Sequence, residues 1–201
     1  MTTVSSINNS GQVAGYSSSP YPGFGPSHAF ITGPNGIGMT ELGTLGGTDS
    51  IAYDINDSGQ VTGSAHTASG DEHAFITEPD GAGMTDLGTL GGLYSRAYAI
   101  NDSGEVVGVA TTAHGESHAF IFSHGGMTDL SLLAPVVAAG WIDLYASSIN
   151  NNGQIVGVGY HNGNYEAFLL SFTTAVPEPE TYLMLLGGLG LIGYLARRRR
   201  K

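Results

Sequence analysis

Three oxygen-bearing side chains precede a glycine in the stretch DINDSG, at Asp54, Asn56 and Asp57. Carboxylate and amide oxygens at this spacing are typical of loops that bind calcium. The stretch departs from that pattern, because Ser58 stands where a third acid is expected and no bidentate glutamate follows at the twelfth position. We therefore expect a tight hairpin turn here. Calcium binding at Asp54, Asn56 and Asp57 is the alternative, and we expect no other cofactor.

Histidine recurs at the start of a short apolar phrase, HAFI, at His28, His73 and His118. A symmetric set of histidines could hold a metal ion. The corresponding fourth position is Glu166, however, and the histidines belong to separate segments of the chain. We therefore expect each histidine to make a structural hydrogen bond. The aromatic residues two positions later are expected in the core: Phe30, Phe75, Phe120 and Phe168.

Nucleophilic catalysis has little support in the sequence. Cysteine is absent and no G-x-S-x-G elbow occurs. The polar residues recur in every unit, whereas a catalytic site is more often a singular feature, so we expect no enzymatic activity. Trp141 and Tyr160 are unrepeated aromatic residues near His161, and they could line a sugar-binding patch or pack on the core. A polysaccharide-acting enzyme is a further hypothesis, although no unrepeated pair of acids supports it.

The segments that must position these residues repeat along the chain. The phrase SSINNSGQVAG at Ser5–Gly15 returns in related form at Tyr53–Gly63, Tyr98–Gly108 and Ser147–Gly157. The steps between the repeated isoleucines are 48, 45 and 49 residues. HAFI follows in the same order, and then GMT(E/D)LGTLGG, which is degenerate in its third occurrence. Three phrases in a constant order indicate a repeat protein.

Each repeat predicts about four short strands joined by tight turns. We expect an all-β fold of about four four-stranded units, near 1–47, 48–92, 93–133 and 134–174. A unit of this size is typical of a β-propeller blade. The expected fold is propeller-like, either small or open, or lacking upstream repeats; a β-sandwich or a stacked β-solenoid is the alternative. The insertion SLLAPVVAAGW at 131–141 predicts a loop or a short helical turn.

Charge is distributed unevenly along the chain. Residues 1–175 contain one basic residue, Arg96, and fifteen acidic ones, which gives this body a formal charge of −14. Such a surface repels phosphate groups, so we expect no nucleic-acid partner. The first residues, MTTVSSINNSGQVAG, lack the basic and apolar regions of a signal peptide. A truncated or misassigned start is one interpretation of that feature.

The C-terminal segment 175–201 differs from the rest of the chain. Residues 181–196 carry no charge and would span roughly 24 Å as a helix, slightly less than the hydrocarbon core of a bilayer. We expect one transmembrane helix here. A basic tail follows it directly: Arg197, Arg198, Arg199, Arg200 and Lys201. By the positive-inside rule this tail stays in the cytoplasm, and the acidic body faces outward.

The order of Pro177, Glu178 and Pro179, a short apolar helix and an arginine-rich end resembles the PEP-CTERM sorting signal of Gram-negative bacteria. In that family the tail holds an exported protein in the inner membrane until an exosortase removes it. The resemblance implies that exosortase is a partner and that the sorting motif is Pro177, Glu178 and Pro179. It also implies a transient inner-membrane location, followed by the cell surface or the extracellular matrix of a biofilm.

The body resembles a second family, the HAF repeats of bacterial extracellular proteins. The resemblance rests on the HAF phrases, the INDSG turns and DLGTLGG at Asp86–Gly92. It implies a propeller-like fold and an extracellular location. Together these features predict an exported repeat protein with a structural or interaction role. The alternative is a carbohydrate- or calcium-binding module on the same scaffold, with extracellular polysaccharide as a partner.

Overall fold

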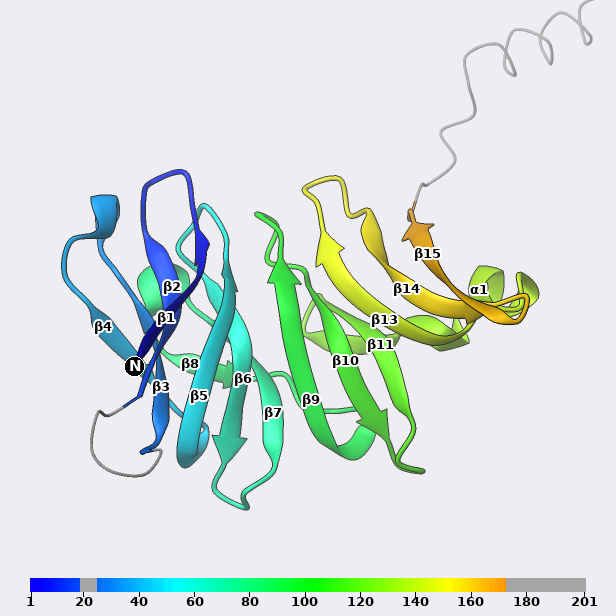
Figure 1. The fold of residues 1–201 in the computed structure, drawn as a ribbon, viewed down its shortest axis with the longest axis horizontal. Coiled ribbons are helices and arrows are strands. Elements are labelled where there is room, and N and C mark those ends of the chain that lie inside the picture. Colours follow the sequence, from blue (N-terminus) through cyan, green and yellow to red (C-terminus); the bar gives the residue numbers. More distant parts are fainter. Residues whose placement is uncertain (19–24, 173–201) are drawn as a thin grey trace, which may run out of the picture. The chain divides into compact units, whose positions relative to one another are not determined.

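The computed structural model describes residues 1–18 and 25–172, and the strands of these residues confirm the all-β class. The first repeat is a four-stranded antiparallel sheet in sequence order. Its strands are β1 (Thr2–Ile7), β2 (Val13–Ser18), β3 (Ser27–Ile31) and β4 (Thr40–Gly43). The fourth repeat is a three-stranded sheet made of β13 (Ile142–Ile149), β14 (Ile155–His161) and β15 (Asn164–Leu170). Consecutive strands are therefore neighbours in both sheets (Figure 1).

The second and third repeats have the same antiparallel order within one eight-stranded sheet. The second consists of β5 (Gly46–Ile55), β6 (Val61–Thr67), β7 (Glu72–Thr77) and β8 (Met84–Asp86). The third consists of β9 (Gly91–Ile100), β10 (Val106–Thr112), β11 (Ser117–Ser123) and β12 (Gly126–Asp129). A single parallel pair, Glu72 with Tyr94, joins the two repeats. Each repeat therefore keeps its own local pairing.

Helical structure is confined to single turns between strands. The 3₁₀ turns are η1 (Pro34–Gly36), η2 (Pro79–Gly81) and η3 (Leu130–Leu132). The only α-helix of the described residues, α1 (Ala134–Ala138), lies in the insertion between the third and fourth repeats. A proline in its first turn favours the helix start. The insertion is therefore the short helical turn that its proline and small residues predicted.

The hairpin between the first two strands of each repeat forms because an asparagine bonds its own turn. Asn56 Oδ1 accepts hydrogen bonds from the backbone N–H groups of Ser58 at 3.1 Å and Gln60 at 3.0 Å. Gly59 adopts a φ of +74°, which a residue with a side chain rarely does. The turn sequence therefore determines where the chain reverses, as the sequence predicted.

A glycine in the second strand of each repeat faces the phenylalanine of the third strand. The pairs are Gly15 with Phe30, Gly63 with Phe75, Gly108 with Phe120 and Gly157 with Phe168. Three of these phenylalanines are buried and Phe168 packs, partly buried, against the last core cluster. The expectation that these aromatic residues pack in the core is confirmed.

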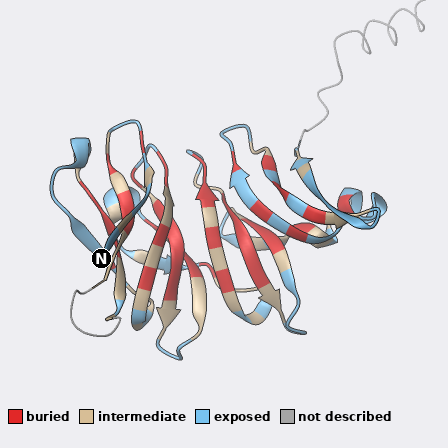
Figure 2. Cartoon of the chain, in the orientation of Figure 1, coloured by how far each residue is buried: buried red, intermediate tan, exposed pale blue. Residues whose placement is uncertain are grey.

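The hydrophobic core lies between consecutive repeats, in three separate clusters. The first cluster joins Ala14, Ala29 and Ile31 of the first repeat to Ile55 and Phe75 of the second. Equivalent clusters join the second repeat to the third and the third to the fourth. The buried stretches in Figure 2 accordingly follow the strands of the middle repeats. Each repeat is thus stabilised mainly by its neighbours, as expected for a repeat protein.

The four repeats do not close into a propeller. The sheets follow one another as a row, with β1–β4 and β13–β15 at its two ends (Figure 1). Apolar side chains on the two end sheets, such as Val4, Ile7, Val156 and Leu169, remain exposed. The expectation of a propeller-like ring is corrected in this respect, because each core cluster involves only two consecutive repeats and none joins the last to the first.

No helix among residues 1–18 and 25–172 has the length and apolar character that a membrane crossing requires. The transmembrane helix expected at 181–196 lies outside the described residues.

Candidate functional site

The repeated asparagines link one hairpin turn to the next. The side chains of the first three donate from Nδ2 to the backbone carbonyl oxygen of the asparagine in the following repeat. The distances are 3.0 Å from Asn8 to Asn56, 3.0 Å from Asn56 to Asn101 and 3.2 Å from Asn101 to Asn150. Three of the four asparagines are buried. The ladder therefore has a structural role, because it satisfies buried polar groups while it sets the spacing of the repeats.

Asp54 and Asp57 also bond to neighbouring repeats. Asp54 accepts a hydrogen bond from Ser6 Oγ at 2.7 Å through Oδ1 and one from the Ile100 N–H at 3.0 Å through Oδ2. Asp57 accepts bonds from the backbone N–H of Asn9 at 3.0 Å and from its Nδ2 at 2.6 Å. These bonds lower the pKa of Asp57, the backbone bond most of all. The carboxylates therefore bond to protein donors on two different repeats.

Asp54, Asn56 and Asp57 each accept hydrogen bonds from protein donors. Within the described ranges, no three His, Asp or Glu side chains are placed to share a metal ion. Calcium binding at these residues stays a prediction.

Each HAF histidine pairs with the acid of the fourth strand in its own repeat. The distances from Nδ1 to the carboxylate are 3.3 Å for His28 with Glu41, 2.8 Å for His73 with Asp86 and 2.6 Å for His118 with Asp129. The pairs lie in different repeats, so the structure does not bring the histidines together. The recurring histidine and the recurring acid thus link the third strand to the fourth strand of these repeats.

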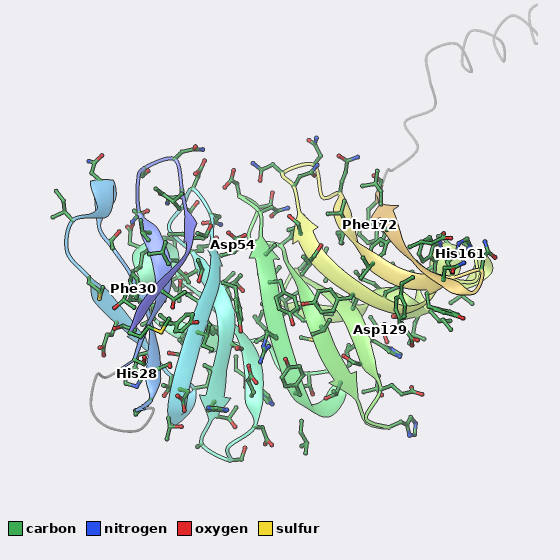
Figure 3. All side chains as sticks on the ribbon, viewed as in Figure 1. His28, Phe30, Asp54, Asp129, His161 and Phe172 are labelled. Carbon is green, nitrogen blue, oxygen red and sulfur yellow. The ribbon has the colours of Figure 1, made fainter. Side chains whose placement is uncertain are left out.

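In the fourth repeat the acid, and not the histidine, stands near the start of the third strand. Glu166 occupies the histidine position, and its Oε2 lies 3.1 Å from Nδ1 of His161. His161 in turn stacks on Trp141, with ring centroids 4.4 Å apart and planes 11° from parallel. Trp141 also packs edge-on against Phe168. Trp141 and His161 are therefore held together, at the opposite end of the row from His28 (Figure 3).

A groove of about 810 Å³ lies between the third and fourth repeats. Its aromatic lining consists of Trp141, Tyr145 and Tyr165. Both tyrosines are exposed. Partial burial raises the pKa of Tyr145 above its ordinary value. Its hydroxyl, like that of any tyrosine, is protonated at neutral pH and can donate a hydrogen bond. Aromatic faces beside hydroxyl donors suit a ligand that has both apolar and polar surfaces.

Polar groups complete the lining of this groove. Glu116, His118, Ser131 and Asp143 contribute to it. Ser131 Oγ is buried and has no hydrogen-bond partner within the described part of the chain. Asp143 has a φ of +51° inside β13, a conformation uncommon for a residue with a side chain and often seen at functional sites. The groove therefore places exposed polar side chains, Glu116 and Asp143, next to exposed rings.

A row of tyrosines leads along the first strands of the repeats to this groove. The ring centroids of Tyr53 and Tyr98 are 5.7 Å apart, and those of Tyr98 and Tyr145 are 5.0 Å apart. Arg96 lies over Tyr53 and is held by Glu72 through a 2.7 Å bond. Sequence reasoning identified Trp141 but missed Tyr145, Tyr165, Glu116 and Asp143. The available signal was that no other repeat has a tyrosine at the position of Tyr165.

Tyr160 does not line the groove, but its ring contacts Tyr165 at a centroid distance of 5.5 Å. The predicted sorting motif, Pro177, Glu178 and Pro179, lies outside the described residues, as does the basic tail 197–201.

Comparison with known proteins identifies the C-terminal segment. Residues 175–201 match the family model of the PEP-CTERM protein-sorting motif. No curated protein matches the chain. The match supports export of this chain through exosortase sorting, with exosortase as the processing partner.

Proposed function

We propose that this chain is a non-catalytic repeat protein of the cell surface or extracellular matrix, released from the inner membrane by exosortase. The observation that carries the proposal is the sorting motif at 175–201, which follows directly on the compact unit Met1–Ser171. In this proposal the helix 181–196 spans the membrane and the basic tail 197–201 remains in the cytoplasm. The resemblance of the body to HAF repeats supports the same location.

The recurring polar residues support a non-catalytic role. The histidines bond to carboxylates of their own repeats, and the asparagines bond to the next turn. Asp54 and Asp57 are likewise occupied by donors of neighbouring repeats. A recurring residue that completes the scaffold in every repeat is not available as a unique general base or nucleophile.

The sorting proposal is tested by expressing the chain behind a signal peptide in hosts with and without exosortase. We expect loss of a C-terminal fragment and release from the inner membrane only when exosortase is present. The variant Glu178→Ala is expected to remain unprocessed, whereas the matched control Glu180→Ala, one acid outside the motif, is expected to be processed normally. Mass spectrometry of the released protein measures the loss of the fragment, and membrane fractionation measures the release. A chain that is never shortened in either host contradicts the proposal.

A second candidate function is carbohydrate binding in the groove between the third and fourth repeats. The observation that favours it is the pair of exposed rings, Tyr145 and Tyr165, beside the exposed carboxylates of Glu116 and Asp143. Sugars present apolar faces that stack on aromatic rings and hydroxyl groups that bond to polar side chains. The tyrosine row that reaches Tyr145 favours an extended polysaccharide over a single sugar.

The variant Tyr165→Ala is expected to weaken binding of an oligosaccharide about tenfold, because it removes an exposed stacking ring without disturbing the core. Tyr16→Ala, in β2 of the first repeat, is the control and is expected to bind as the parent does. A glycan array selects the oligosaccharide, and isothermal titration measures its affinity. A parent chain that binds nothing on the array, or equal affinities for both variants, would rule out this function.

A further inference from the structure

Every internal repeat has two apolar faces with different partners. The leading face contacts the following repeat and, in the third repeat, includes Val107, Ala119 and Ile121. The trailing face contacts the preceding repeat and, in the fourth repeat, includes Ile149 and Ile155. All three internal core clusters pair a leading face with the trailing face of the next repeat. The two faces are therefore complementary surfaces that the chain uses three times.

The trailing face of the first repeat has no partner among the described residues. Ile7 is 66% exposed, whereas the equivalent isoleucines of the later repeats are 6%, 6% and 8% exposed. Those isoleucines are Ile55, Ile100 and Ile149. Val4 is also 63% exposed, and the alanine at its position is fully buried in the other repeats. For the isoleucines the difference in exposure arises from the missing neighbour, because their residue type and local strand pairing are the same.

The leading face of the fourth repeat is uncovered in the same way. Leu169 is 64% exposed, against 7% for the equivalent Ile121 of the third repeat. Val156 is 42% exposed, while the equivalent Val107 is fully buried. Ala167 is exposed as well. Among the described residues, one leading face and one trailing face are thus uncovered, at the fourth and the first repeat.

The residue types at these two ends match an interface that the chain already forms. Val156 and Ala167 repeat the types of Val107 and Ala119, which pack on the fourth repeat. Ile7 repeats the type of Ile149. These three equivalences follow from the strand registers. A junction formed from the two ends would therefore reproduce the strand-to-strand part of the packing between the third and fourth repeats, which additionally includes Leu130 and Val136 of the insertion.

The polar ladder can continue across the same junction. Within the chain, the N–H of Asp57 donates to Asp102 Oδ1 at 3.0 Å, and the N–H of Asp102 donates to Asn151 Oδ1 at 2.9 Å. A following repeat would present its own acceptor to Asn151. In the first repeat the equivalent residue is Asn9, whose side chain carries the required oxygen. Both the apolar and the polar parts of the junction are thus complementary.

We propose that the leading face of the fourth repeat binds the trailing face of the first repeat in a second copy of this chain. The interface is heterologous, so successive copies add head to tail and form a closed ring or an open filament. This inference does not depend on carbohydrate binding or on processing by exosortase. It adds a mode of assembly that suits a protein of an extracellular matrix.

Two variants that each block one face test the proposal in the full chain, kept in detergent because of its apolar C-terminal segment. Ile7→Arg places a charge on the trailing face and Leu169→Arg places one on the leading face. Both side chains are exposed, so neither substitution opens the core of the single chain. We expect the parent to sediment as assemblies larger than a monomer, and each variant alone to sediment as a monomer.

The decisive sample is a mixture of the two variants. Each retains the face that the other has lost, so the mixture is expected to form a one-to-one complex with twice the monomer mass. Ile37→Arg, an exposed isoleucine outside both faces, is the control and should assemble like the parent. A parent that is monomeric, or a mixture that stays monomeric, overturns the proposal. Association that persists in the double variant Ile7→Arg/Leu169→Arg also overturns it and assigns the contact to the shared C-terminal segment.

Discussion

Replacing Gly108 with alanine is expected to destabilise the protein by about 3 kcal/mol or more. The reason is that the added methyl group would clash with the neighbouring backbone in the middle of the sheet. An ideal Cβ at this position would overlap the carbonyl oxygen of Arg96 and lie 2.9 Å from the Cα of Ala97. Both atoms belong to the backbone of β9, where the pairing with β10 shifts register. The alanine can be accommodated only if the strands separate. Thermal unfolding followed by circular dichroism measures the effect.

Gly126→Ala is the matched control for this variant. Gly126 lies in β12 of the same repeat, its φ is not positive, and no atom lies within 4 Å of its Cβ position. We expect its stability to stay within about 0.5 kcal/mol of the parent. Equal melting temperatures for the two variants would show that the close approach of β9 and β10 does not require glycine.

The second large effect is expected for Asn56→Ala, which should cost about 3 kcal/mol. Asn56 is buried and makes four hydrogen bonds. Two of them hold its own turn through Ser58 and Gln60, and one reaches the carbonyl oxygen of Asn101 in the next repeat. Alanine leaves these groups without a partner inside the protein, and each such group costs about 1–3 kcal/mol. Chemical denaturation of the purified chain measures the loss.

The variant Asn150→Ala measures what the bonds within the turn contribute to stability, apart from the bond between repeats. Asn150 makes the same bonds within its turn, but it is exposed and donates to no following repeat among the described residues. We therefore expect a loss of about 1 kcal/mol. If Asn150→Ala and Asn56→Ala destabilise the protein equally, the bond between repeats contributes nothing measurable and the role assigned to the ladder is wrong.

Much of the local structure could be predicted because it depends on nearby residues. The INDSG phrases place hairpins where the structure has them, since asparagine bonds its own turn and the glycine accepts a positive φ. The phenylalanines of the HAF phrases are in the core, as their place in a short apolar strand indicated. The periodicity of the three phrases also indicated an all-β repeat protein before any pairing was known.

Other residues recur visibly in the sequence, but the sequence does not show the physical reason why they recur. The glycine in the second strand of each repeat, such as Gly108, is needed because the opposite strand bulges and brings a carbonyl oxygen against it. The acid of the fourth strand recurs because it bonds to the histidine of the third. Both reasons depend on how two strands pair, and a single strand does not specify its partner.

The groove could not be predicted from spacing. Glu116 and His118 come from the third repeat, whereas Asp143 and Tyr165 come from the fourth. They meet because the fourth repeat packs on the third with α1 and its flanking turn inserted between them in sequence. Sequence reasoning recognised Trp141 as an unrepeated aromatic residue, but it had no means of identifying the side chains that would face it.

By itself, the sequence determined the repeat, its hairpins, its buried aromatic residues and the sorting signal at 175–201, which the family match supports. These depend on neighbouring residues or on a contiguous motif. Only the tertiary structure decided that the four repeats form an open row and that a groove lies between the last two. The angle between repeats arises from the packing of whole faces, so whether the row closes depends on small rotations that add along the chain. That accumulation leaves Ile7 and Leu169 exposed at its two ends.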